Sequence, residues 1–104
     1  MTARIDSIGA QLISLKSKSG TEYIWQRDPA HWKSCSPLLF PTIGNCRDGK
    51  YTLSSQSYTI PKHGFCRNAD FISSDVSDEK ASFTLTDSPE THSCYPFAFQ
   101  LKLT

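Results

Sequence analysis

The stretch FAFQLKLT (97–104) alternates large apolar residues with small or polar ones. The apolar set is Phe97, Phe99, Leu101 and Leu103. Because side chains of a β-strand point alternately to opposite faces, this spacing places the whole set on one face of a strand. The segment therefore predicts a strand with one apolar face, and the rest of the chain follows the same pattern.

Strand-like segments occur along most of the chain, and short turn signals separate them. ASFTLTD (81–87) and ADFISSDVS (69–77) each predict one strand. GKYTLSSQSYTIP (49–61) predicts a hairpin that turns near Ser54 and Ser55, and AQLISLKSKSGTEYIW (10–25) predicts another that turns near Gly20. With no long helix between the strands, the expected fold is an all-β, antiparallel β-sandwich.

Helix is expected only within RDPAHWKSCS (27–36), and only for one or two turns. Asp28 suits the N-cap and Pro29 suits the first helical position. The segments SDEK (77–80) and DSPE (87–90) are predicted to be turns.

Composition excludes several classes of function. Eleven basic residues oppose ten acidic ones, and the net charge of +1 gives no basis for binding nucleic acid or an anionic membrane. No run of about 18 apolar residues could span a bilayer, and the N-terminus lacks the apolar core of a secretion signal. We therefore expect a cytoplasmic protein.

Four cysteines, at positions 35, 46, 66 and 94, have irregular spacing and form no C-x-x-C pair. Zinc sites usually need close cysteine pairs, and disulfides belong to oxidising compartments. The expectation is four free thiols and no metal site.

The segment PKHGFCRN (61–68) concentrates the residues that could carry chemistry. His63 can serve as acid, base or hydrogen-bond donor near neutral pH. Gly64 permits positive φ or a close approach of the backbone, Phe65 offers an apolar wall, and Arg67 offers a forked donor. The alternative is a plain turn between strands with a hydrogen-bonded histidine.

A second polar loop lies in PLLFPTIGNCRDGKY (37–51), where Asn45, Arg47 and Asp48 could line a pocket. The alternative is a structural loop with a charged surface. Trp25 and Trp32 could stack on sugar faces, although burial in a core is the commoner role of tryptophan. His31 and His92 are expected to be solvated.

Taken in order, these stretches resemble the aldose 1-epimerase (galactose mutarotase-like) family, in its LacX-like branch. FPTIGNCRDGKY (40–51) is similar to the family's F-P-x-x-G-R-x-x-x-G-x-Y segment. YTIPKHGFCRNADF (58–71) is similar to its P-x-H-G-F-A-R-D segment, and YPFAFQLKL (95–103) to its Y-P-F-x-F-x-L strand. The resemblance covers nearly the whole chain.

The resemblance implies a large β-supersandwich, of which residues 1–104 form the N-terminal portion of a single domain. It implies an activity that interconverts the α and β anomers of a small-molecule aldose without a cofactor. His63 matches the family's first active-site histidine, and Phe65 and Arg67 match the residues after it. Asn45 stands where the family has an arginine, so Arg47 is an alternative occupant of that space.

The family's second histidine and its glutamate, the expected general acid and base, match no position in these residues. The resemblance therefore implies a portion that is inactive alone. Two alternatives remain open: a non-catalytic carbohydrate-binding β-sandwich, and a purely structural β-domain. Open strand edges also predict self-association, unless the C-terminal strand folds back to close a small sandwich.

Overall fold

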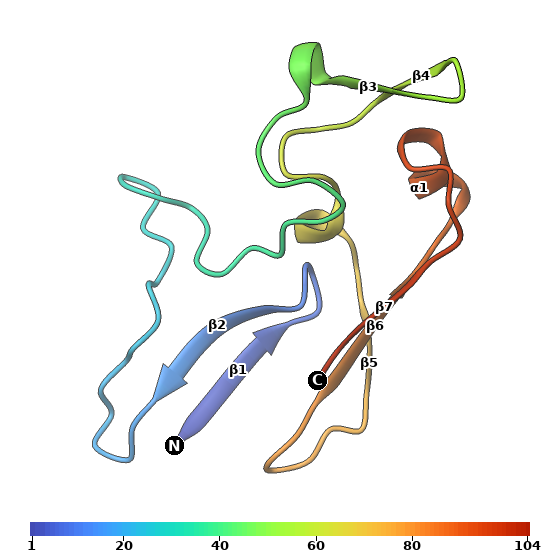
Figure 1. The fold of residues 1–104 in the computed structure, drawn as a ribbon. Helices are drawn as coiled ribbons and strands as arrows, with labels where there is room; N and C mark the ends of the chain where they lie inside the picture. Colours follow the sequence, from blue (N-terminus) through green and yellow to red (C-terminus); the bar gives the residue numbers. More distant parts are fainter.

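The computed structural model describes all residues, 1–104, and consists mostly of short strands with little helix (Figure 1). The elements are β1 (Thr2–Asp6), β2 (Gln11–Lys16), η1 (Arg47–Gly49), β3 (Lys50–Leu53), β4 (Gln56–Thr59), η2 (Cys66–Asn68), β5 (Ile72–Ser74), β6 (Ser82–Thr86), α1 (Pro89–Cys94) and β7 (Gln100–Leu103). They form the antiparallel sheets β1-β2, β3-β4 and β5-β6-β7. The predicted antiparallel, all-β class is confirmed.

The hairpin predicted over residues 49–61 forms as expected. Tyr51 lies opposite Tyr58 across β3 and β4, and their rings stack with centroids 5.4 Å apart. Ser54 and Ser55 turn the chain with φ of 47° and 68°. Positive φ at both central residues is the feature of a type I′ turn, whose twist matches that of the flanking strands.

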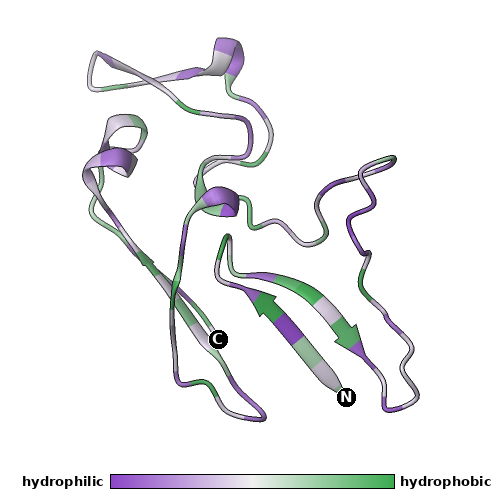
Figure 2. Cartoon of the chain, turned by 180° about the vertical axis from the view of Figure 1, so that it is seen from behind, coloured by the Kyte–Doolittle hydropathy of each residue, from purple (hydrophilic) through white to green (hydrophobic).

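The hairpin predicted at Gly20 is wrong in its second arm. The chain does turn there, since the Gly20 amide donates to the Ser17 carbonyl at 3.1 Å. Beyond the turn, however, pairing with β2 is limited to the bridge between Glu22 and Lys16 and the hydrogen bond that the Tyr23 amide donates to the Leu15 carbonyl at 2.9 Å, and residues 24–36 run without regular structure. β2 pairs instead with β1, a short strand whose polar and apolar residues alternate from Thr2 to Asp6 (Figure 2).

The helix predicted within residues 27–36 is also wrong. Asp28 makes only one turn, in which its side chain accepts from the Ala30 amide at 2.9 Å. The helix lies at α1, where the sequence predicted a turn. Ser88 caps it, because its hydroxyl accepts from the Thr91 amide while the Thr91 hydroxyl accepts from the Ser88 amide.

The core is small and the molecule is flat. Only eight of the 104 residues are buried, and the central cluster consists of Cys66, Phe71 and Phe83. The principal extents are 56 × 35 × 15 Å and the radius of gyration is 16.2 Å. A compact domain of about 100 residues has a radius of gyration of about 13 Å, so these strands form an open layer rather than a closed sandwich.

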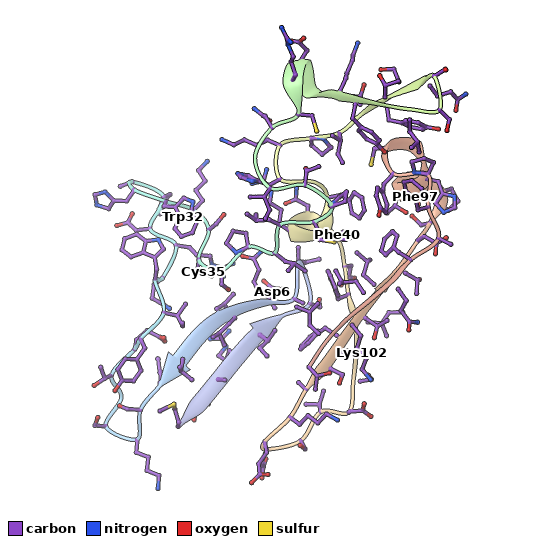
Figure 3. The ribbon with its side chains drawn as sticks, in the orientation of Figure 1. Asp6, Trp32, Cys35, Phe40, Phe97 and Lys102 are labelled. Atoms are coloured by element: carbon purple, nitrogen blue, oxygen red, sulfur yellow. The ribbon has the colours of Figure 1, made fainter.

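The C-terminal strand keeps most of its predicted pattern. Leu101 and Leu103 are half-buried while Lys102 is exposed, and β7 pairs only with β6, leaving one strand edge free. Phe97 departs from the prediction, because it precedes the strand, lies beside α1 and is 43% exposed (Figure 3). No helix in the structure has the length and apolar character needed to cross a membrane.

Candidate functional site

Two loops far apart in sequence, residues 40–49 and 61–67, are joined through their backbones. The Phe40 carbonyl accepts from the Phe65 amide at 3.0 Å and from the Cys66 amide at 3.3 Å. Phe40 also forms a parallel bridge with Gly64. The two polar segments that the sequence singled out therefore lie together.

His63 lies in a tight turn that begins at Pro61. The Gly64 amide closes the turn on the Pro61 carbonyl at 2.9 Å. His63 has φ of 68° and Gly64 has φ of 73°. Positive φ is uncommon outside glycine, although histidine is among the residues enriched there. The expected freedom of Gly64 is confirmed, and its backbone packs directly on that of Phe40.

Gly44 fixes the side chain of His63 from the other loop. The Gly44 amide donates to His63 Nδ1 at 2.9 Å, and the His63 amide donates to the Gly44 carbonyl at 2.8 Å. The His63 residue is half-buried. Asn45 follows Gly44 directly in the chain, so the paired loops bring Asn45 and His63 to the same part of the surface.

The two arginines differ in how firmly they are held. The Arg67 guanidinium donates to the Lys62 carbonyl at 3.2 Å, which draws it back over the turn that carries His63. Arg67 is half-buried, and its own carbonyl accepts from the Gln11 side chain. Arg47 begins η1 and is exposed, and its side chain forms no hydrogen bond or ion pair. The Arg67 side chain is thus fixed on the turn that carries His63, whereas that of Arg47 is not held by a polar contact.

Phe65 belongs to an aromatic cluster beneath the turn. Its ring lies 6.0 Å from that of Phe40, 5.9 Å from that of Phe99 and 6.4 Å from that of Tyr95. These aromatic pairs contribute about 0.5–1.5 kcal/mol each beyond the area they bury. Phe65 therefore supports the loop from below, and only part of its half-buried surface is free to act as a wall.

Cys66 contributes no nucleophile to this region. It is fully buried in the core cluster, and burial raises the pKa of its thiol to about 11. The thiolate is the reactive form of cysteine, so this side chain stays inert at neutral pH. All four cysteines are unpaired, and no group of three metal-ligating side chains lies together.

Two concave regions of the chain lie away from His63. A concave region of about 700 Å³ lies between β1 and the segment 73–83, and another of about 450 Å³ lies between η2 and α1. His63 lines neither region, whereas Phe65 lines the second.

Sequence reasoning missed the part played by Gly44. The glycine stands three residues after Pro41 in the F-P-x-x-G segment, but nothing in the pattern shows that its amide meets a histidine ring 19 residues away. The one sequence feature that pointed to this contact was the presence of a glycine in the first polar loop. Backbone donors of this kind leave no trace in side-chain patterns.

The tryptophans do not form the expected core. Trp25 is 43% exposed and Trp32 is 51% exposed, and the Trp25 indole donates to the Trp32 carbonyl at 2.7 Å. His31 and His92 are exposed as predicted. The His92 ring also lies 2.8 Å from an Asp87 carboxylate oxygen.

Comparison with known proteins connects both loops to one family. The family model for aldose 1-epimerase matches residues 1–104. The plasmid and chromosomal forms of protein LacX from Lactococcus lactis subsp. lactis are each 32% identical over 108 residues, which cover 99% of this chain and 36% of the relative. The chain thus spans about a third of the length of these relatives.

Solved structures agree with this result. A galactose mutarotase-like protein from Lactobacillus casei ATCC 334 is 39% identical with a TM-score of 0.92, over 96% of this chain and 34% of that one. A galactose mutarotase related enzyme from Lactobacillus acidophilus is 37% identical with a TM-score of 0.93, over the same shares of each chain. The predicted all-β fold of the galactose mutarotase-like type is therefore confirmed.

Proposed function

The chain belongs to the aldose 1-epimerase family, and on this basis we propose that it supplies part of a site that interconverts the α and β anomers of an aldose. The reaction opens the sugar ring. A base removes the proton of the anomeric hydroxyl and an acid protonates the ring oxygen, after which rotation and closure give the other anomer. His63 is the catalytic residue that we assign to this chain, in contact with the sugar near its ring oxygen.

The observation that carries this proposal is the pairing of the two polar loops through Gly44 and His63. In this proposal the imidazole, the Asn45 amide and the Arg67 guanidinium face the sugar together. Neutral sugars are recognised through hydroxyl groups, which both donate and accept hydrogen bonds, and these side chains provide such partners. Phe65 supplies apolar support, and Arg47 is a further candidate donor to the sugar.

Binding of the sugar is the first test. Titration of the 104-residue chain with galactose or glucose, followed by amide chemical shifts, is expected to perturb residues of both loops. His63→Ala is expected to weaken this effect strongly, while Trp25→Ala leaves it unchanged. Shifts confined to residues 23–32 would contradict the assignment of the site.

Activity is the second test. We propose that the 104-residue chain alone does not accelerate mutarotation, because the reaction needs an acid and a base on the same sugar. No hydrogen bond or ion pair joins His63 to a carboxylate. Polarimetry of the purified chain should give the buffer rate. A saturable rate that disappears in His63→Ala would contradict this.

A non-catalytic carbohydrate-binding module is the second candidate. Its supporting observation is the exposure of Tyr23, Trp25 and Trp32, at 59%, 43% and 51%, on one irregular segment. Aromatic rings can stack on the apolar faces of sugars. In that case Trp32→Ala would abolish sugar binding and His63→Ala would not.

We also propose that the chain is cytoplasmic and that it self-associates through open strand edges. Unpaired thiols suit a reducing compartment, and the free edge of β7 can pair with another strand. Sedimentation over a concentration series should show association that Phe99→Lys, next to the start of β7, weakens. Ile43→Lys, an exposed position outside every strand, is the matched control. A wild-type chain that stays monomeric at every concentration would exclude the edge contact.

A further inference from the structure

Gly44 and His63 are joined by two hydrogen bonds, one of which is made by the imidazole ring. The Gly44 amide lies 2.9 Å from His63 Nδ1, and the same two residues are joined in the reverse direction by the His63 amide and the Gly44 carbonyl at 2.8 Å. The ring is therefore held by a backbone group whose own position is fixed by a second hydrogen bond.

A backbone N–H can only donate, so the nitrogen that faces it must accept. In a neutral imidazole one ring nitrogen carries the proton and the other carries the free lone pair. Since Nδ1 uses its lone pair on the Gly44 amide, the proton of the neutral ring lies on Nε2. The hydrogen bond made by one ring nitrogen thus sets the role of the other.

We propose that Gly44 is a positioning residue that holds His63 in the Nε2–H tautomer, so that His63 meets the sugar as a hydrogen-bond donor and not as the base. This inference rests on the proposed function for the identity of the ligand, but the tautomer itself does not. A sugar ring oxygen is a pure acceptor, so an Nε2–H donor suits it. The group that removes the anomeric proton must then be another residue.

The direct test is nuclear magnetic resonance on the full ¹⁵N-labelled chain without sugar. Long-range proton–nitrogen spectra should show a pyridine-like Nδ1 and a pyrrole-like Nε2 in His63. A scalar coupling across the hydrogen bond should connect Nδ1 to the Gly44 amide nitrogen. His31 is the internal comparison, because it is exposed and its ring forms no hydrogen bond. The chemical shifts of its two ring nitrogens should therefore be averages over both tautomers.

Three outcomes would overturn the proposal. A pyrrole-like Nδ1 in His63 would assign the opposite tautomer. Absence of the coupling while the Phe65 amide stays protected from exchange would show that the loops pair without the ring contact. Loss of protection at Phe65 as well would overturn the paired-loop geometry on which the inference stands.

Two variants at position 63 distinguish the effect of the side-chain acceptor from the effect of the positive φ. His63→Asn keeps an acceptor oxygen near the position of Nδ1 and tolerates positive φ, whereas His63→Gly adopts positive φ without any acceptor. Gly44 amide exchange should stay near the wild-type rate in His63→Asn. It should be about 2- to 10-fold faster in His63→Gly, as expected for one hydrogen bond.

Sugar binding then tests the proposed function separately. Both variants lack the Nε2–H donor, so both should lose affinity for galactose. Gly44 amide exchange could be faster in His63→Gly than in His63→Asn while both variants keep the wild-type affinity for galactose. That result would support the positioning role of Gly44 and contradict the proposed function. Equal Gly44 exchange rates in the two variants would instead remove the positioning role.

Discussion

Gly64→Ala is expected to separate the two loops of the candidate site. A Cβ on Gly64 would lie 2.6 Å from the Pro41 nitrogen and closer still to the Phe40 carbonyl. All of these neighbours are backbone atoms, which cannot move aside as the end of a flexible side chain can. The added methyl group therefore has to push residues 61–67 away from residues 40–49.

The magnitude follows from two contributions. An L-residue in the left-handed region, here at φ of 73°, costs about 1–2 kcal/mol. Separating the loops also breaks the hydrogen bonds that the Phe65 and Cys66 amides donate to Phe40, and a buried donor left unpaired costs about 1–3 kcal/mol. The expected loss is about 3–8 kcal/mol, against a total stability of about 5–15 kcal/mol for a small domain.

Gly20→Ala is the matched control. Gly20 has φ of 89°, but a Cβ there meets no atom within 4 Å, so only the conformational cost of about 1–2 kcal/mol applies. Urea unfolding followed by circular dichroism gives the global loss for both variants. Amide exchange at Phe65 gives the local one, and 3 kcal/mol corresponds to at least about a hundredfold faster exchange. If Gly64→Ala loses no more than Gly20→Ala, the close backbone contact is refuted.

Three further predictions concern a carboxylate, a helix cap and the cysteines. Hydrogen bonds from Ser14, Leu15 and Ile24 lower the pKa of Glu22 from 4.5 to about 2. The ionised Glu22 carboxylate therefore stabilises the fold fully above pH 4.5, and this stabilisation is lost as the pH falls towards 2. The difference in urea midpoint between wild type and Glu22→Gln should shrink over that range. Ser88→Ala removes the cap of α1 and should cost about 0.5–2 kcal/mol in urea unfolding, whereas Ser93→Ala should cost less. Thiol titration should count four thiols in the denatured, unreduced protein, with Cys66 the slowest to react in the native state; a count of two would reveal a disulfide.

Local patterns predicted the strands better than they predicted their partners. Period-two alternation located β3, β4, β6 and β7, and in β3, β4 and β7 one face packs while the other meets solvent. β2 pairs with the strand before it, across the short connection of residues 7–10, rather than with the segment after it. The turn at Gly20 is real, but the Glu22 carboxylate caps the amides of Leu15 and Ile24 and the chain then leaves the sheet.

The helix was misplaced because the two candidate segments carry nearly the same signal. Asp28-Pro29 and Ser88-Pro89 both combine a capping residue with proline at the first helical position. The difference lies three residues after the cap, where Thr91 returns a hydrogen bond to Ser88. His31 occupies the equivalent position after Asp28, and no such bond is recorded there.

The candidate site was predicted as a set of side chains, whereas the structure builds it mainly from the backbone. His63 adopts positive φ, which costs free energy in isolation, and the Gly44 loop holds it there through two hydrogen bonds. The same loop is fastened to the Phe40 carbonyl, which also anchors Cys66 of the core cluster. The orientation of the imidazole and the stability of the core thus depend on one set of contacts. Substitutions at Gly64 should therefore lower sugar affinity and stability together, whereas His63→Asn should lower affinity while the chain stays folded.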